Sequence, residues 1–513
     1  MTRLALKTPA LHVIVALFIF FALNFNPADV HAQQTSTYAY HQPTEMMVNY
    51  GRQALMICNG LFVSNRSLDL IYEQELKLNR MPVLPPSMVT IDEKRQAVAV
   101  GGGGNSPYPA MRAAYRQGLG CVVMAPDQTF DDIGDLPILE TAPAPGDPSH
   151  IPWPDGDVIP DGAPQISIDA EALEAAGDWA FDRENHGGHV SQVTISLVVV
   201  YKGHLIYERY ALGVDRTTRT RTWSTAKSIA STLIGIAVGQ GKLDLDAPLP
   251  FTDWGPWRGM PASEDDPRRQ ITLRHALHMS SGLYPVDNRR CSVIGSCLSY
   301  FAGESAVRGA LNRGLVREPG AYWDYENYDT ILGVYALKTA LADEQTYLEF
   351  PRRALFDKIG MRNTLPGVDR FGDYVMSSQV YTNARDLARL GMLYLNKGRW
   401  NGEQLFPESW VDFSRTPAAS TKERGRFYGG QWWLVPDDRT DIPSDAYSTA
   451  GHRGQFTVVV PSYDLVIVRR GLDWLPGQHR FSQWDLTREV LKALPNQRWG
   501  EKPGQAAVEG SEE

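Results

Sequence analysis

Ser224 and Lys227 lie three residues apart at the start of an apolar segment, TRTWSTAKSIASTLIG. That spacing places both side chains on one face of a helix, about one turn apart. An ammonium group is costly to bury, and a desolvated lysine gives up its proton more readily than a solvated one. Lys227 could therefore act as the base that activates the Ser224 hydroxyl. Because Ser-x-x-Lys alone is a weak pattern, a capping serine with an exposed lysine stays the alternative.

The residues after Ser224 predict a helix that is buried on every side. Apolar side chains point to nearly all of its faces: Ile229, Leu233, Ile234, Ile236 and Val238. Gly241 is placed to end this helix. Ser224 would then lie at the helix N-terminus, where backbone N–H groups stabilise developing negative charge.

Two further stretches add polar residues of the kinds that such a reaction needs. Tyr325-Glu326-Asn327 precedes a predicted helix, and His452-Arg453-Gly454 precedes a predicted strand. With these motifs in this order, the sequence over residues 166–490 resembles the serine hydrolases built on the fold of class C β-lactamases and D-alanyl-D-alanine peptidases. Family VIII carboxylesterases and 6-aminohexanoate-dimer hydrolases belong to that group.

The resemblance implies a role for each matching residue. Ser224 would be the nucleophile that forms an acyl-enzyme, and Lys227 would be its base. Tyr325 would pass a proton to the leaving group, and Asn327 would hold the lysine and the substrate. The backbone N–H groups of Ser224 and Gln455 would form the oxyanion hole.

The third motif departs from the pattern of the antibiotic-binding relatives, which carry Lys-Thr-Gly there. This chain has His452, followed by Arg453 and Gly454. A histidine at that position looks more like the esterases and the aminohexanoate-dimer hydrolases. Either His452 or Arg453 could still assist an anionic substrate.

The fold expected from the sequence is α+β. Residues 193–210 and 455–471 predict two hairpins, which suggest one antiparallel sheet built from both ends of the catalytic domain, with helices inserted between. The expected division is a leader at 1–32, an α+β region of unknown role at 33–135 and a Pro/Gly-rich linker at 136–165. A hydrolase domain at 166–494 and a disordered tail at 495–513 complete it.

The first residues predict an export signal. Arg3 and Lys7 precede an apolar run, and the small-residue site at Val30-His31-Ala32 predicts cleavage after Ala32 and a periplasmic or secreted protein. The alternative is an uncleaved anchor, although the apolar run is short for a membrane span. No later stretch is long and apolar enough to cross a bilayer.

An oxidising compartment would allow the four cysteines to form disulfides. The favoured pairs are Cys58 with Cys121 and Cys291 with Cys297, because each pair lies within one region; four free thiols are the alternative. No metal or cofactor is expected, since His186 and His189 lack the carboxylate or HExxH context of a zinc site. The net charge of −9 makes nucleic acid an improbable partner, and the oligomeric state is open.

The resulting hypothesis is an exported serine hydrolase that acts on a small ester or amide, most like a carboxylesterase or a 6-aminohexanoate-dimer hydrolase. One alternative is a β-lactamase or a D-alanyl-D-alanine carboxypeptidase. An alternative of another class is a non-catalytic binding or sensor module that keeps this fold.

Overall fold

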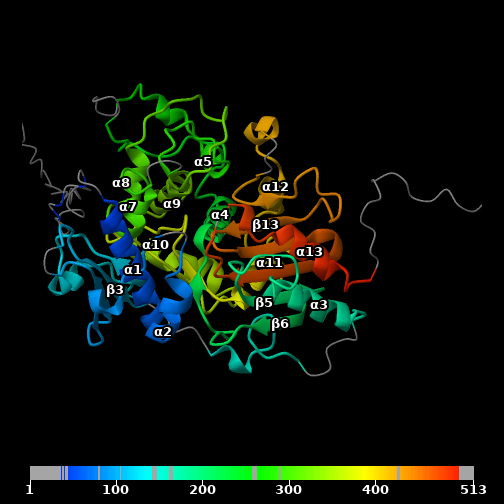
Figure 1. The fold of residues 1–513 in the computed structure, drawn as a ribbon. Coiled ribbons are helices and arrows are strands. Elements are labelled where there is room, and N and C mark those ends of the chain that lie inside the picture. Colours follow the sequence, from blue (N-terminus) through cyan, green and yellow to red (C-terminus); the bar gives the residue numbers. More distant parts are fainter. Residues whose placement is uncertain are drawn as a thin grey trace, which may run out of the picture. The chain divides into compact units, whose positions relative to one another are not determined.

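The two predicted hairpins lie side by side in the main sheet of the computed structural model (Figure 1). The structure describes residues 36, 38, 40, 44–78, 81–103, 106–140, 147–160, 166–256, 263–287, 291–424, 428–475 and 477–495. The first hairpin is β5 (Thr194–Tyr201) and β6 (His204–Tyr210), and the second is β14 (Gln455–Val460) and β15 (Leu465–Gly471). β15 pairs antiparallel with β5, with Val468 opposite Val198. The expected sheet from both ends of the domain is therefore confirmed.

The complete sheet has six strands in the order β12-β13-β14-β15-β5-β6, where β12 is Trp433–Leu434 and β13 is Tyr447–Gly451. The turn between β5 and β6 is tight because Lys202 and Gly203 both have positive φ angles, 50° and 79°. Two consecutive positive φ values are typical of the two-residue turns that match the twist of paired strands.

Both faces of the central strands are buried, and alternate residues belong to different cores. Leu197 and Val199 pack in the core that includes α3 (Ala170–Phe181) and α13 (Gln483–Leu491). Val198 and Val200 face the larger core on the opposite side. There the sheet packs against α11 (Ala384–Leu395), whose N-cap Asn383 accepts a hydrogen bond from the Asp386 N–H. Helices thus cover both faces of the sheet, which explains the long apolar runs in its central strands.

The predicted buried helix is α4 (Ala226–Gly239), and every residue from Ala226 to Ala237 is buried. It contacts α9 (Asn327–Leu341), and both belong to the large core. The other helices of this part are α5 (Leu273–Leu277), α7 (Ser296–Phe301), α8 (Ala306–Leu311), α10 (Glu344–Pro351) and α12 (Glu408–Arg415). Two smaller sheets are formed by β7 (Thr220–Arg221), β9 (Val380–Thr382) and β8 (Leu365–Pro366), and by β10 (Arg399–Trp400) and β11 (Glu403–Gln404).

The region before the linker has its own small sheet. Helix α1 (Glu45–Phe62) packs on strands β2 (Ala97–Val100), β3 (Met111–Arg116) and β4 (Gly120–Val123), with β1 (Val89–Asp92) at the edge. The short helix α2 (Leu68–Leu70) and a π-helical turn, Ile71–Glu75, follow α1. This helix and this sheet lie within residues 33–135.

Both favoured disulfides are present. Cys58 of α1 is bonded to Cys121 of β4, and Cys291 is bonded to Cys297 of α7. The first joins residues that are 63 positions apart in the sequence, and the second joins residues that are 6 positions apart. The predicted leader and nearly all of the predicted tail lie outside the described residues. Among the residues that are described, the structure contains no helix of the length and apolarity that a membrane span requires.

Gly51 of α1 packs against the backbone at the end of α7. A Cβ atom at Gly51 would lie 1.6 Å from the carbonyl oxygen of Phe301. We therefore expect Gly51→Ala to lower the free energy of unfolding by about 1–3 kcal/mol in chemical denaturation, because one backbone must move. Gly134→Ala is the matched control, since nothing lies within 4 Å of its Cβ position. Because alanine is the better helix former, a stabilised Gly51→Ala protein would contradict this contact.

Candidate active site

Ser224 lies in a 3₁₀ turn, Trp223–Thr225, directly before α4. The preceding residue, Trp223, has a φ of 50°, a left-handed conformation that is unfavourable for a bulky side chain. Neighbours hold Trp223 there: the His452 ring centroid lies 5.1 Å from its ring, and the Arg221 guanidinium lies 4.1 Å away. Backbone strain of this kind is often found at functional sites, where the surrounding structure enforces it.

The Lys227 amine meets three polar groups inside the protein. Its Nζ lies 3.2 Å from Ser224 Oγ, 2.6 Å from Asn327 Oδ1 and 2.7 Å from the Ser377 carbonyl oxygen. The lysine is buried, with 1% of its surface exposed. The predicted alternative of a lysine that reaches solvent is therefore wrong.

These contacts determine how a neutral Lys227 amine is oriented. Asn327 Oδ1 and the Ser377 carbonyl can only accept hydrogen bonds, so each takes one N–H of the amine. A neutral amine has two N–H groups and one lone pair. Its lone pair is therefore left for the Ser224 hydroxyl, the group from which a base would remove the proton.

The electrostatic environment makes the neutral form accessible. Burial lowers the pKa of Lys227 to about 7, with the charge of Arg221 acting in the same direction and those of Asp287 and Glu326 opposing it. The neutral amine is therefore populated at neutral pH, which it would not be at the usual lysine pKa.

Tyr325 lies beside this pair. The Lys227 Nζ lies 5.0 Å from the centre of the Tyr325 ring. Burial raises the pKa of Tyr325 above its usual value, and a side-chain hydrogen bond with Ser224 opposes that rise. The ring belongs to an aromatic cluster, because Trp433 lies 5.5 Å and Tyr428 5.9 Å from it. A phenol in this environment stays protonated at neutral pH, so it can donate a proton when one is needed.

Asn327, the first residue of α9, is held by groups that the sequence did not reveal. Its Nδ2 donates to Asp287 Oδ2 at 2.7 Å and to Ser296 Oγ at 3.0 Å. Asp287, Ser296 and the Ser377 carbonyl were all missed by the sequence analysis. No motif marks them, because each reaches the site only through tertiary contacts.

The third motif forms a turn between strands. His452, Arg453 and Gly454 connect β13 to β14, and Arg453 and Gly454 have φ angles of 64° and 79°. Burial and the charges of nearby arginines lower the pKa of His452 to about 4, so its ring is neutral at neutral pH. Gln455 lies near the start of α4, because its carbonyl accepts a hydrogen bond of 2.9 Å from Thr225 Oγ1.

Arg453 does not point its charge toward the serine and lysine. Its guanidinium is buried and donates to the backbone carbonyls of Gln74, Glu75, Leu472 and Asp473. These hydrogen bonds link the third motif to the π-helical turn that follows α2. Gly454 is enclosed as well, since a Cβ there would lie 1.7 Å from Arg469 Nη1.

The two closely spaced histidines lie in the loop before β5. His189 Nδ1 lies 2.8 Å from Ser191 Oγ, and the His189 ring packs 4.0 Å from that of His479. Within the part of the chain that the structure describes, no three histidine, cysteine or carboxylate side chains are grouped as ligands of a metal ion.

The chain is similar to several known proteins. The family model described as Beta-lactamase matches residues 184–491. An uncharacterized protein of Alkalihalophilus pseudofirmus is 22% identical over 322 residues, which cover 57% of this chain and 90% of the relative. Similar solved structures include a putative 6-aminohexanoate-dimer hydrolase from Bacillus anthracis (22% identity, TM-score 0.49, 59% of this chain and 81% of the other). A family VIII carboxylesterase is also similar (12% identity, TM-score 0.48, 64% and 98%).

Proposed function

The chain belongs to the beta-lactamase family of hydrolases, and from that premise we propose that it is an exported serine hydrolase that cleaves an ester or amide bond through an acyl-enzyme on Ser224. The observation that carries this proposal is the orientation of the Lys227 amine. Two acceptors engage its N–H groups, and its lone pair is left for the Ser224 hydroxyl.

The proposed reaction begins with proton transfer from Ser224 to Lys227 as Oγ attacks the substrate carbonyl carbon. The resulting oxyanion would accept hydrogen bonds from the backbone N–H groups of Ser224 and Gln455. Tyr325 would donate its proton to the leaving group, and the Lys227 ammonium would return a proton to the phenolate. Water would then attack the acyl carbonyl carbon while Tyr325 and Lys227 take up its proton. As the bond to Ser224 Oγ breaks, Lys227 would return a proton to that oxygen, and the acid would be released.

An uncharged substrate fits the third motif better than an anionic one. His452 is neutral at neutral pH, and the Arg453 guanidinium donates its hydrogen bonds to backbone carbonyls. Neither residue supplies the cation with which β-lactam-binding relatives grip a carboxylate. We therefore favour neutral esters and amides as substrates over β-lactams and D-alanyl peptides.

Export is proposed from the leader at residues 1–32, and the two disulfides support it because such bonds persist in oxidising compartments. The proposed location is the periplasm or the exterior of the cell.

A fluorophosphonate probe tests the proposed mechanism, because it phosphonylates activated serines. We expect one label per chain, located on the peptide that contains Ser224 by mass spectrometry after digestion. A panel of p-nitrophenyl esters, short amides, a D-alanyl peptide and a chromogenic cephalosporin should give turnover with the neutral esters or amides. No label and no turnover with any member of the panel would favour the non-catalytic binding module. Faster turnover of the cephalosporin or the D-alanyl peptide would favour the alternative enzyme classes.

A further inference from the structure

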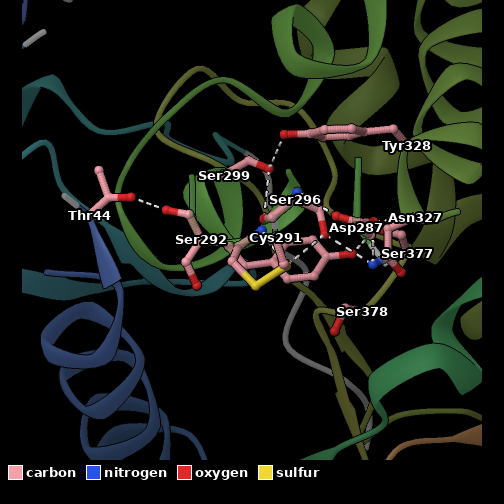
Figure 2. The surroundings of a disulfide bond; sticks show 12 residues. Thr44, Asp287, Cys291, Ser292, Ser296, Ser299, Asn327, Tyr328, Ser377 and Ser378 are labelled. Atoms are coloured by element: carbon pink, nitrogen blue, oxygen red, sulfur yellow. Dashed lines mark hydrogen bonds between the residues drawn. A yellow bond between two sulfur atoms is a disulfide. The ribbon is translucent and has the colours of Figure 1, made fainter. Parts of the chain in front are cut away.

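Asp287 is a partly buried carboxylate that is separated from the lysine by one side chain, that of Asn327. Its Oδ2 accepts hydrogen bonds from the Asn327 backbone N–H at 3.1 Å and from Asn327 Nδ2 at 2.7 Å. Its Oδ1 accepts the backbone N–H of Ser296 at 2.7 Å. Figure 2 shows Asp287 and Asn327 meeting beside Ser296 and Ser377.

The Asp287 carboxylate determines which way the Asn327 amide faces. An ionised carboxylate can only accept, so the NH₂ group of Asn327 must be turned toward Asp287. The amide oxygen is thereby turned toward Lys227. In the opposite orientation the amide would present N–H groups to the amine, and Lys227 would lose one of its two acceptors.

The intervening amide also limits the electrostatic effect of Asp287. A carboxylate in direct contact with Lys227 would strongly favour the ammonium form, which cannot act as a base. At its actual place, the charge of Asp287 raises the pKa of Lys227 only enough to offset part of the effect of burial.

Asp287 carries that charge because its neighbours favour ionisation. Burial alone would raise the pKa of Asp287, but hydrogen bonds from Glu326, Ser296 and Asn327 outweigh it and lower the pKa. Burial, together with the charge of Asp287, raises the pKa of Glu326 well above its usual range. Ionisation is therefore favoured at Asp287 and disfavoured at Glu326.

Helix α7 supports both acceptors of the lysine. Ser296, its first residue, accepts a hydrogen bond from Asn327 through Oγ and donates to Asp287 through its backbone N–H. Tyr300, one turn later, has its hydroxyl 2.5 Å from Ser377 Oγ, the side chain of the residue whose carbonyl accepts from Lys227.

The disulfide Cys291–Cys297 fixes the start of this helix. Cys297 follows Ser296 directly, and its backbone N–H donates to Cys291 Sγ at 3.1 Å. In the same loop the Ser292 carbonyl accepts a hydrogen bond from the Thr44 hydroxyl (Figure 2). The loop is therefore tied both to its own helix and to the segment before α1.

We propose that Asp287 is a positioning residue for Lys227, acting through the Asn327 amide, and that the Cys291–Cys297 disulfide keeps α7 in place to support it. This inference rests on the proposed function of Ser224 and Lys227. It assigns a task to the second disulfide that the first does not share, since Cys58–Cys121 joins α1 to β4.

The first experiment uses Asp287→Asn and the dependence of kcat/KM for a neutral ester on pH. The charged groups that shift the Lys227 pKa are Asp287, Glu326 and Arg221. The centre of the Tyr325 ring lies 5.0 Å from Lys227 Nζ. Removing the negative charge of Asp287 destabilises the ammonium, so the midpoint of the rising limb should move to lower pH. Because the charge of Asp287 also raises the pKa of Glu326, the double variant Asp287→Asn/Glu326→Gln is measured beside the single one, and its midpoint should also lie below that of the wild type.

We also expect Asp287→Asn to lower kcat about tenfold or more with little change in KM, because the amine loses its orientation. Asp329→Asn is the matched control. Asp329 is a buried carboxylate of α9 that accepts hydrogen bonds from Arg313 and Ser281. It is not among the charges that shift the Lys227 pKa. The control should lose stability and keep the wild-type midpoint. An unchanged midpoint and kcat in Asp287→Asn would overturn the inference.

The second experiment compares the two disulfides. Cys291→Ser/Cys297→Ser should lower kcat several-fold and leave KM nearly unchanged. Cys58→Ser/Cys121→Ser should lower the unfolding temperature and leave the kcat of the folded protein unchanged, because that bond joins α1 to β4 and not to the loop before α7. Equal kcat values in folded samples of the wild type and the first variant would remove the role of the second disulfide.

Reduction of the wild-type protein gives the same comparison if a variant does not fold. Two thiols of dithiothreitol form a disulfide, and the Cys291–Cys297 bond takes up the two electrons and two protons to give two thiols. Cys291 and Cys297 are half-buried whereas Cys58 and Cys121 are buried, so iodoacetamide should alkylate the first pair earlier. Activity should fall in step with that alkylation; full activity after it would contradict the proposal.

The outcomes separate this inference from the function on which it rests. Hydrolysis that does not depend on Ser224 would overturn both. Hydrolysis that depends on Ser224 but is indifferent to Asp287 and to the Cys291–Cys297 bond would overturn the inference alone.

Discussion

Replacing Ser224 by alanine is expected to lower kcat for ester hydrolysis by about a thousandfold or more and to abolish labelling by a fluorophosphonate. The reason is that no other hydroxyl shares the Lys227 lone pair. The other two contacts of the amine within the described structure are an amide oxygen and a backbone carbonyl, neither of which can act as the nucleophile.

Ser228→Ala is the control for that experiment. Ser228 lies one turn further along α4, is buried, and donates its hydroxyl to the Gln431 carbonyl. The Ser228→Ala protein should still be labelled at Ser224 and keep most of its activity. Comparable rates for Ser224→Ala and the wild type would exclude the acyl-enzyme mechanism, whatever the substrate.

The second large effect is expected for Lys227→Ala, which should lower kcat by on the order of a hundredfold or more. The wild-type kcat/KM should rise with pH through a midpoint near the Lys227 pKa of about 7, because only the neutral amine can take the serine proton. Below that pH the ammonium form predominates and activity is lost. The variant should show no such limb.

Other groups at the site should not imitate this limb. The pKa of His452 is lowered to about 4 by burial and nearby arginines, and burial raises that of Tyr325, so neither changes charge near neutral pH. Assays of Lys227→Ala and the wild type from pH 5 to 9 distinguish the possibilities. A limb that persists in Lys227→Ala would assign the titration to a different group.

The sequence predicted the parts of this site that depend on local pattern. The apolar residues after Ser224 indicated a helix buried on all sides, and α4 is buried from its first residue to Ala237. Alternation and turn residues indicated both hairpins, and their pairing followed from the common way in which sheets bury such strands. The order of the three motifs indicated the family.

The sequence predicted the position of the third motif but not the contacts of its side chains. The triplet was expected ahead of a strand, and β14 begins directly after it. The charge of Arg453 drew attention to substrate binding, yet backbone carbonyls of the region before the linker take up its donors. Residue type alone does not reveal where a long side chain finds its partners.

By itself the sequence determined the fold class, the family, the buried helix and the serine and lysine at its start. Only the tertiary structure decided that the lysine is buried, that its lone pair is left for the serine, and that Asp287 accepts a hydrogen bond from the Asn327 amide. The physical reason is distance along the chain. Hydrophobic periodicity acts within one element, whereas the acceptors of Lys227 lie 100 and 150 residues away, and the desolvation that lowers its pKa comes from elements assembled around it.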